Sequence, residues 1–203
     1  WSSDVCSSDL VQREDGYQPV DGEGVRYEVG DLGGLLEPRR DSDDRLRWTR
    51  PVGWHVTTSF MGDVDLWRVE SLVEHLAITA SRAAPFDVGL SGGVTFPSPD
   101  RAKVLALAVG LGYDQLAALS AGCRRAGSRA GIEVDGARFV GHLTLARASH
   151  GFNATRWLEV LGSLPRWAWR ADELCLIESL RRGREYAVVE RFALGAPARG
   201  ALD

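Results

Sequence analysis

Two short stretches of the sequence correspond to each other: Gly53-Trp54-His55-Val56-Thr57-Thr58 and Val140-Gly141-His142-Leu143-Thr144-Leu145. Each holds the pattern His-x-Thr inside a run of apolar and β-branched residues, which is typical of a strand. Because side chains alternate between the two faces of a strand, the histidine and the threonine of each stretch project from the same face. The repeated motif predicts two similar halves, each contributing one strand to a shared site.

The segment that follows the first motif predicts the order strand, helix, strand, strand. The motif strand is expected over residues 54–61, followed by a helix over residues 64–80 with Asp63 as its N-terminal cap. Two apolar runs separated by prolines then predict strands over residues 86–96 and 103–111.

The second half predicts a related order. We expect a helix over residues 113–129, the motif strand over 138–147, a short amphipathic helix over 154–161, and closing strands over 167–180 and 184–194. These elements predict an α+β fold in which two antiparallel sheets form a bilobal, pseudo-twofold arrangement with flanking helices and a central cleft.

The N-terminal region does not follow this pattern. Residues 1–10 are rich in Ser and Asp and lack the basic start and apolar stretch of a secretory signal, so we interpret them as foreign to the protein. Residues 1–22 as a whole are expected to be a disordered lead-in. A helix is expected over residues 25–36, and residues 23–203 are expected to form a single bilobal domain.

The composition argues against several classes of protein. No uncharged apolar run approaches the length of about 18 residues that a membrane-spanning helix needs, so we expect no membrane association. The cysteines are odd in number, scattered and without a CxxC pair, which argues against a disulfide framework and a zinc ribbon: Cys6, Cys123 and Cys175. We expect a cytoplasmic monomer in a reducing setting.

The net charge limits the way in which a nucleic acid can bind. A formal charge of −4 opposes broad, sequence-independent binding along a nucleic-acid backbone, so an RNA partner is expected to be held locally. Basic residues do gather in two places, where they predict either a restricted positive rim or a solvated face: Arg124, Arg125 and Arg129, and then Arg181, Arg182 and Arg184.

Two histidines and two threonines on one surface suit the cleavage of a phosphodiester. One imidazole takes a proton from the attacking oxygen while the other gives a proton to the leaving oxygen, and imidazole titrates near neutrality. The hydroxyls of Thr57 and Thr144 can donate hydrogen bonds to the non-bridging phosphate oxygens. Arg147, just beyond the second motif, can add a charge-assisted contact. His75 and His150 lack this setting and are expected to be surface or packing residues.

The two motifs resemble those of the 2H phosphoesterases, and within them those of the RNA 2′,3′-cyclic phosphodiesterases, also called 2′-5′ RNA ligases. The resemblance covers most of the chain. Residues 46–62, which read Leu-Arg-Trp-Thr-Arg-Pro-Val-Gly-Trp-His-Val-Thr-Thr-Ser-Phe-Met-Gly, are similar to the first motif of that family and its approach. Residues 139–147, Phe-Val-Gly-His-Leu-Thr-Leu-Ala-Arg, are similar to the second, and residues 174–186 to the closing hairpin.

The resemblance implies hydrolysis of RNA 2′,3′-cyclic phosphate termini to 2′-phosphomonoesters, with reverse 2′-5′ ligation as a further direction. It implies His55 as the proton donor and His142 as the proton acceptor, with no metal and no cofactor. The implied partner is an RNA terminus or a small nucleotide cyclic phosphodiester. Gly141 stands where the family usually has a proline, and Thr58 where it usually has an aliphatic residue. No apolar strand precedes residue 25, so one sheet is expected to have an unpaired edge.

Three other interpretations stay open. The motifs hold phosphate and say little about the base, so a linear 2′-5′ oligonucleotide or an ADP-ribose cyclic phosphate is an alternative substrate. A non-catalytic module that binds RNA ends is a second alternative, although two intact histidines argue against it. A metal enzyme is a third, although the sequence has no HExxH motif and no Cys/His ligand spacing.

Overall fold

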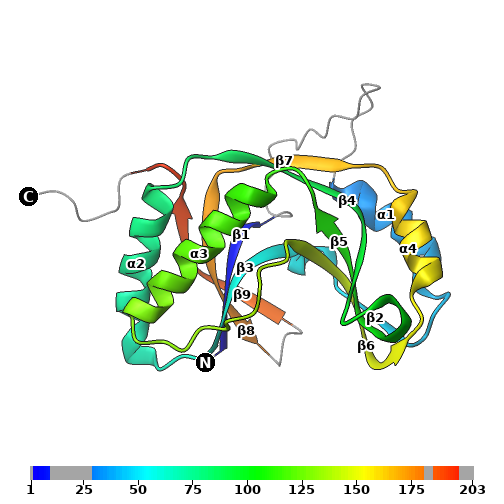
Figure 1. Cartoon of the computed structure of the whole chain (residues 1–203), viewed down its shortest axis with the longest axis horizontal. Coiled ribbons are helices and arrows are strands. Elements are labelled where there is room, and N and C mark those ends of the chain that lie inside the picture. The colour runs from blue at the N-terminus through cyan, green and yellow to red at the C-terminus, as the bar shows by residue number, and fades with distance from the viewer. Residues whose placement is uncertain (1, 10–28, 181–184, 197–203) are drawn as a thin grey trace, which may run out of the picture.

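The computed structural model describes residues 2–9, 29–180 and 185–196 (Figure 1). Five strands form one half of a curled antiparallel sheet and include the second motif: β2 (Leu46–Trp48), β4 (Phe86–Phe96), β5 (Ala102–Val109), β6 (His142–Phe152) and β7 (Trp167–Ala171). The other half includes the first motif: β1 (Ser2–Asp9), β3 (His55–Asp63), β8 (Glu173–Leu180) and β9 (Glu185–Ala193). We call these the β6 half and the β3 half.

The two halves join where β3 pairs with β6, through Val56 and Leu143. The strand order is β7-β4-β5-β6-β3-β1-β8-β9, with β2 also on β6, so four strands extend outward from the junction on either side. This arrangement confirms the α+β class and the pseudo-twofold halves. The two sheets expected from the sequence are joined at the junction into one curled sheet.

Four helices flank the sheet at its two ends (Figure 1): α1 (Val29–Arg40), α2 (Val69–Ser81), α3 (Tyr113–Arg129) and α4 (Thr155–Gly162). Helix α3 packs against α2 and β3, and α4 packs against β4. Leu116, Leu119 and Cys123 recur at helical spacing and are all buried, which gives α3 its inner face. None of the described helices is both long and apolar enough to cross a bilayer.

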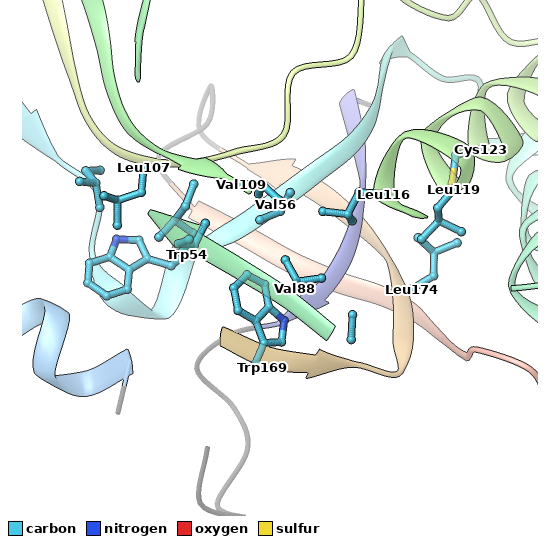
Figure 2. Packing of buried hydrophobic residues seen from close by; sticks show 14 of the residues in the cluster. Trp54, Val56, Val88, Leu107, Val109, Leu116, Leu119, Cys123, Trp169 and Leu174 are labelled. Carbon is cyan, nitrogen blue, oxygen red and sulfur yellow. The ribbon is translucent and has the colours of Figure 1, made fainter. Parts of the chain in front are cut away.

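The core lies between the helices and the inward face of the sheet, as Figure 2 shows for the residues around the junction. Val56 of β3 and Leu107 of β5 are fully buried there, and Trp54, just before β3, is 1% exposed. Complete burial of such a side chain contributes about 1.5–3 kcal/mol each. Because alternate residues of a strand face opposite ways, this packing turns the neighbouring histidine to the outer face.

The N-terminal segment differs from its expected structure. Strand β1 pairs with β3 on one side and with β8 on the other, so the expectation of a disordered lead-in is wrong for Ser2–Asp9, and no sheet edge is left open there. Strand pairing uses backbone N–H and C=O groups, which every residue except proline carries, so a Ser- and Asp-rich segment can complete a sheet. Residues 10–22 lie outside the described residues, and the foreign origin of residues 1–10 stays a prediction.

Several helix and strand boundaries also differ, among them those of β6, which spans His142–Phe152 in place of residues 138–147. Asp63 is the last residue of β3 and caps no helix, because a short 3-10 turn, Leu66–Arg68, precedes α2. The single strand expected over residues 167–180 is interrupted at Asp172, where the chain crosses from the β6 half to the β3 half. Helix α1 begins at Val29, and residues 25–28 lie outside the described residues.

Candidate active site

Strands β3 and β6 present their motifs in the same way. Along β3, His55 and Thr57 are half-buried, whereas Val56 and Thr58 are buried. Residues 142–145 of β6 repeat this order of half-buried and buried positions. In both strands the histidine and the threonine therefore share the face that points away from the core, as the alternation predicts.

The pairing of the two strands brings the motifs together. Val56 and Leu143 lie directly opposite each other in an antiparallel pair. Continuing this register by one residue on either side sets each histidine opposite the threonine of the other motif: His55 opposite Thr144, and Thr57 opposite His142. Opposed side chains have Cβ atoms about 4.5–5.5 Å apart. Two imidazoles and two hydroxyls are therefore expected to lie close together on the outer face of the sheet, around the Val56–Leu143 pair.

A backbone carbonyl two residues upstream orients each imidazole. Nδ1 of His55 lies 2.8 Å from the carbonyl oxygen of Gly53, and Nδ1 of His142 lies 2.7 Å from that of Val140. A carbonyl oxygen only accepts hydrogen bonds, so Nδ1 carries a proton and donates it in both contacts. Nε2 is then the nitrogen of each ring that exchanges a proton with a substrate.

An aromatic ring packs against each histidine. Tyr186 of β9 lies edge-on to His55 with the ring centroids 4.8 Å apart, and Phe96 of β4 lies tilted against His142 at 4.7 Å. Such contacts restrict the rotation of the imidazole rings. Neither role was predictable from the sequence, whose only signal is an aromatic residue beside the β4–β5 turn and another beside the β8–β9 turn.

A β-bulge decides where Arg147 lies. Consecutive residues of β5 oppose Thr144 and Ala146, so Leu145 is the extra residue on β6. Leu145 and Ala146 are both buried, and Arg147 after them is exposed. Plain alternation would put Arg147 on the core face with Leu145. The bulge turns it to the face that carries His142.

Strand β3 has a bulge at the matching position. There Thr58 is the extra residue, because consecutive residues of β1 oppose Thr57 and Ser59. The Thr58 hydroxyl donates a hydrogen bond to Sγ of Cys123, 3.7 Å away, which accommodates a polar residue where the family usually has an aliphatic one. Phe60 then occupies the place that Arg147 has on β6, and it is 46% exposed.

The environment of His142 favours its neutral form. Burial lowers the pKa of His142 below its ordinary value, the hydrogen bond to Val140 opposes this in part, and the charge of Arg147 lowers the pKa further. A lowered pKa leaves the imidazole neutral near pH 7, and a neutral imidazole can accept a proton.

The remaining candidates lie elsewhere. His75 is on α2 and His150 is an exposed residue of β6, and neither belongs to the His-x-Thr face. Cys123 and Cys175 are buried thiols outside the His-x-Thr face, and burial raises the pKa of the Cys123 thiol to about 12. In the described parts of the chain, no group of three or more His, Cys, Asp or Glu side chains gathers in a way that could hold a metal ion.

A cavity of about 490 Å³ lies away from the histidines, between α2, α3 and the segment before β4. Its lining includes Arg82, Arg125 and Arg129, so two arginines of the first basic cluster gather at its edge. Neither motif strand contributes to it. The second basic cluster, residues 181–184 with one glycine among the arginines, lies outside the described residues.

Comparison with known proteins places this arrangement in a family. The family model described as 2′-5′ RNA ligase superfamily matches residues 36–183, which include both His-x-Thr strands. The chain belongs to the 2′-5′ RNA ligase superfamily. It is thus a member of the 2H phosphoesterases, as its motifs predict.

Two relatives of this superfamily member have names that describe an activity. The chain is 28% identical over 155 residues to a protein of Aquifex aeolicus (strain VF5) named RNA 2′,3′-cyclic phosphodiesterase; the match covers 73% of this chain and 82% of that protein. It is 29% identical over 157 residues to a protein of Geobacillus stearothermophilus with the same name, where the match covers 74% of this chain and 48% of that protein.

Solved structures share the fold of this superfamily member. LigT of E. coli in complex with 3′-AMP has a TM-score of 0.65 at 18% identity, over 95% of this chain and 97% of that one. The protein TT0787 of Thermus thermophilus has a TM-score of 0.64 at 20% identity, over 96% of this chain and 98% of that one. These likenesses confirm the α+β architecture with its curled antiparallel sheet.

Proposed function

We propose that this chain hydrolyses the 2′,3′-cyclic phosphate at an RNA terminus to a 2′-phosphomonoester. His142 acts as the proton acceptor and His55 as the proton donor. Thr57, Thr144 and Arg147 bind the substrate, the two threonines at the cyclic phosphate itself. The observation that supports this most strongly is the pairing of Val56 with Leu143, the residues between the histidine and the threonine of each motif, which brings the two motifs side by side.

The reaction needs one proton removed and one supplied. Nε2 of His142 takes a proton from water as the water oxygen forms a bond to phosphorus. The bond between phosphorus and the ribose 3′-oxygen breaks, and Nε2 of His55 protonates that oxygen as it leaves. The hydroxyls of Thr57 and Thr144 donate hydrogen bonds to the non-bridging oxygens, where negative charge increases. After release of the product, solvent restores both protonation states.

The geometry supports this division of roles. A hydrogen bond from Nδ1 to a carbonyl holds each imidazole so that its Nε2 can act. The lowered pKa of His142 suits a base, which must start neutral. The Aquifex and Geobacillus relatives are both named RNA 2′,3′-cyclic phosphodiesterase, a name that fits hydrolysis of this kind of terminus. When a 5′-hydroxyl replaces the attacking water, the same proton transfers yield a 2′-5′ linkage, so ligation is the corresponding second direction.

The direct test is hydrolysis of a short RNA that ends in a 2′,3′-cyclic phosphate, in the presence of a chelator. The expected product is the 2′-phosphomonoester, identified by 31P NMR and by chromatography against both monoester standards. His142→Ala is the inactivated variant. His150→Ala, which removes an exposed histidine of the same strand, is the matched control and should keep wild-type activity.

Each other result points to a different function. Tight binding of the RNA end without turnover would identify a binding module. Activity that is lost in chelator and returns with a divalent ion would identify a metal enzyme. Turnover of a linear 2′-5′ oligonucleotide or an ADP-ribose cyclic phosphate, with none of the RNA terminus, would keep the mechanism and change the substrate.

A further inference from the structure

Two arginines lie directly opposite each other next to the motifs. Arg47 of β2 pairs with Arg147 of β6 in the antiparallel register. The adjacent cross-strand pairs are Leu46 with Ala148 and Trp48 with Ala146. Leu46 and both alanines are buried, Trp48 packs against the core, and the two arginines are exposed. Both guanidinium groups therefore project from the outer face of the sheet, the face that carries His142.

This arrangement is unfavourable without an anion. Like charges directly opposite each other on neighbouring strands are destabilising, because their Cβ atoms are only about 4.5–5.5 Å apart. The structure gives neither Arg47 nor Arg147 an ion pair or a side-chain hydrogen bond within the described ranges. Exposed arginines elsewhere on the sheet do have acidic partners, as Arg170 has Asp87 and Arg191 has Glu173. A bound anion would remove the repulsion between the two arginines.

The position of the pair indicates which anion. Arg147 follows His142 by five residues along β6, one of which is the extra residue of the bulge, so the advance along the sheet is about four residues, or roughly 13 Å at about 3.3 Å per residue. The pair therefore lies beyond the phosphate that the motifs hold, in the direction in which a longer substrate can continue. A guanidinium group binds phosphate oxygens through paired N–H donors, and two such groups can grip one phosphodiester from both sides.

We propose that Arg47 and Arg147 form a clamp for the first internal phosphodiester of an RNA chain. Through this clamp the site selects oligonucleotides over cyclic mononucleotides. The inference rests on the proposed hydrolysis and adds a substrate class and a binding residue, Arg47, to it. Arg47 acts on substrate binding and takes no part in proton transfer, so its effect appears in KM more than in kcat.

The test compares two substrates that end in the same nucleotide. Adenosine 2′,3′-cyclic phosphate has no internal phosphodiester, and the dinucleotide ApA with a terminal 2′,3′-cyclic phosphate has one. The quantity measured is the ratio of kcat/KM for the dinucleotide to kcat/KM for the mononucleotide. Wild type should prefer the dinucleotide, and Arg47→Ala should reduce the ratio about 10-fold or more, through KM. Arg47→Lys should recover part of it, because the charge returns without the paired donors.

Two controls separate the clamp from a general effect of charge. Arg125→Ala removes an exposed arginine of α3 that lines the distant cavity, and it should leave the ratio at the wild-type value. A dinucleotide whose internal linkage is an uncharged methylphosphonate should lose the preference in wild type and show no further loss in Arg47→Ala. Higher salt should reduce the preference of wild type more than that of Arg47→Ala.

The outcomes separate the two proposals. If wild type hydrolyses both substrates and Arg47→Ala leaves the ratio unchanged, the clamp is wrong and the proposed function stands. If the methylphosphonate dinucleotide is preferred as strongly as the phosphodiester, the preference comes from the added base and the clamp is again wrong. If wild type hydrolyses neither substrate, the proposed function is wrong and the clamp with it.

Discussion

Strands β3 and β6 share one geometry and differ at a position that decides their electrostatics. Their first seven residues follow the same order of buried and half-buried positions, both strands have a bulge at the matching residue, and both histidines donate Nδ1–H to a carbonyl two residues upstream. Five residues after the histidine, β6 has Arg147 and β3 has Phe60. A symmetric scaffold thus carries an asymmetric charge.

This asymmetry gives a physical reason for distinct roles. A cation near an imidazole disfavours its protonated form, so Arg147 helps to keep His142 neutral. A general base must start neutral, whereas a general acid must start protonated. Phe60 is uncharged and leaves the matching position on β3 without a cation. The difference between the strands therefore supports His142 as the base and His55 as the acid.

The largest expected effects come from removing the histidines. His55→Ala and His142→Ala should each lower kcat/KM for an RNA 2′,3′-cyclic phosphate by about 10²–10⁴. The two variants should diverge on an aryl phosphodiester, because a phenolate leaves with little need of a proton. His55→Ala should regain a substantial fraction of the wild-type rate there, and His142→Ala should stay slow on both substrates.

The control for this pair is His75→Ala, which removes a histidine of α2 outside the site and should leave both rates unchanged. Rescue of His142→Ala in place of His55→Ala would reverse the roles. Equal rescue of both variants would mean that neither histidine has a dedicated role, and would leave electrostatic stabilisation by Thr57, Thr144 and Arg147 as the main effect.

The strands beside β3 and β6 give the next largest effect. β5 beside β6 reads Ala-Lys-Val-Leu-Ala-Leu-Ala-Val, and β1 beside β3 reads Ser-Ser-Asp-Val-Cys-Ser-Ser-Asp. If β1 acts mainly through its backbone, deletion of residues 1–10 should lower the melting temperature by roughly 10 °C. The exposed edges of β3 and β8 should also promote association, measurable by light scattering.

A different Ser- and Thr-rich segment of the same length is the matched control, and it should restore most of the lost stability. An unchanged melting temperature after the deletion would show that β1 contributes nothing to the folded protein. It would also favour the interpretation of residues 1–10 as foreign sequence.

The contrast between β1 and β5 also shows what the sequence can predict. Where the apolar pattern is strong, the prediction holds: α3 spans the residues expected for it, and β4 and β5 follow closely. β1 has no such pattern. Its place in the sheet depends on pairing with β3 and β8, which lie far away in the sequence, so the local residues do not predict it. The break at Asp172 is similar, since residues 167–180 were expected to be one strand and are divided where the chain crosses from the β6 half to the β3 half.

The features of the candidate site also divide into those that a local pattern predicts and those that depend on tertiary pairing. The His-x-Thr motifs and their shared face follow from strand periodicity, which is a local property. The bulges at Thr58 and Leu145 leave no mark in a single sequence, because an extra residue is recognisable only against the partner strand. Alternation alone places Arg147 on the core face, so its true position could be found only once the bulge was known. Arg47 and the rings of Tyr186 and Phe96 also required the tertiary pairing.

A smaller effect separates Arg147 from Phe60 by pH. Arg147→Met should lower kcat/KM at neutral pH by roughly 10-fold, because a charge-assisted contact is lost. It should also raise the pKa of His142, since the cation that lowers it is gone. The acidic limb of the kcat/KM profile requires neutral His142, so this limb should move to higher pH. Phe60→Met, which exchanges the matching residue of β3, should leave the acidic limb in place. A shift of this limb to lower pH in Arg147→Met would contradict the proposed effect of the Arg147 charge on the pKa of His142.

The smallest expected effect concerns the glycines just before the two motif strands. A Cβ added at Gly141 would lie 3.0 Å from Cβ of Val109, closer than ordinary contact, whereas one added at Gly53 would lie 3.6 Å from the rings and methyl groups of Tyr186 and Thr49. Alanine reduces the freedom of the unfolded chain, which stabilises by about 0.4–1 kcal/mol where the site has room. Gly53→Ala should therefore raise the denaturant midpoint slightly. Gly141→Ala must push Val109 away inside packed core, at a cost of about 1–3 kcal/mol, and should lower the midpoint. Urea titration of both variants measures the two shifts of the midpoint, which should have opposite signs. A midpoint that rises for Gly141→Ala would show that β5 can move at this point. The chain just before His142 would then be packed no more tightly than the chain just before His55.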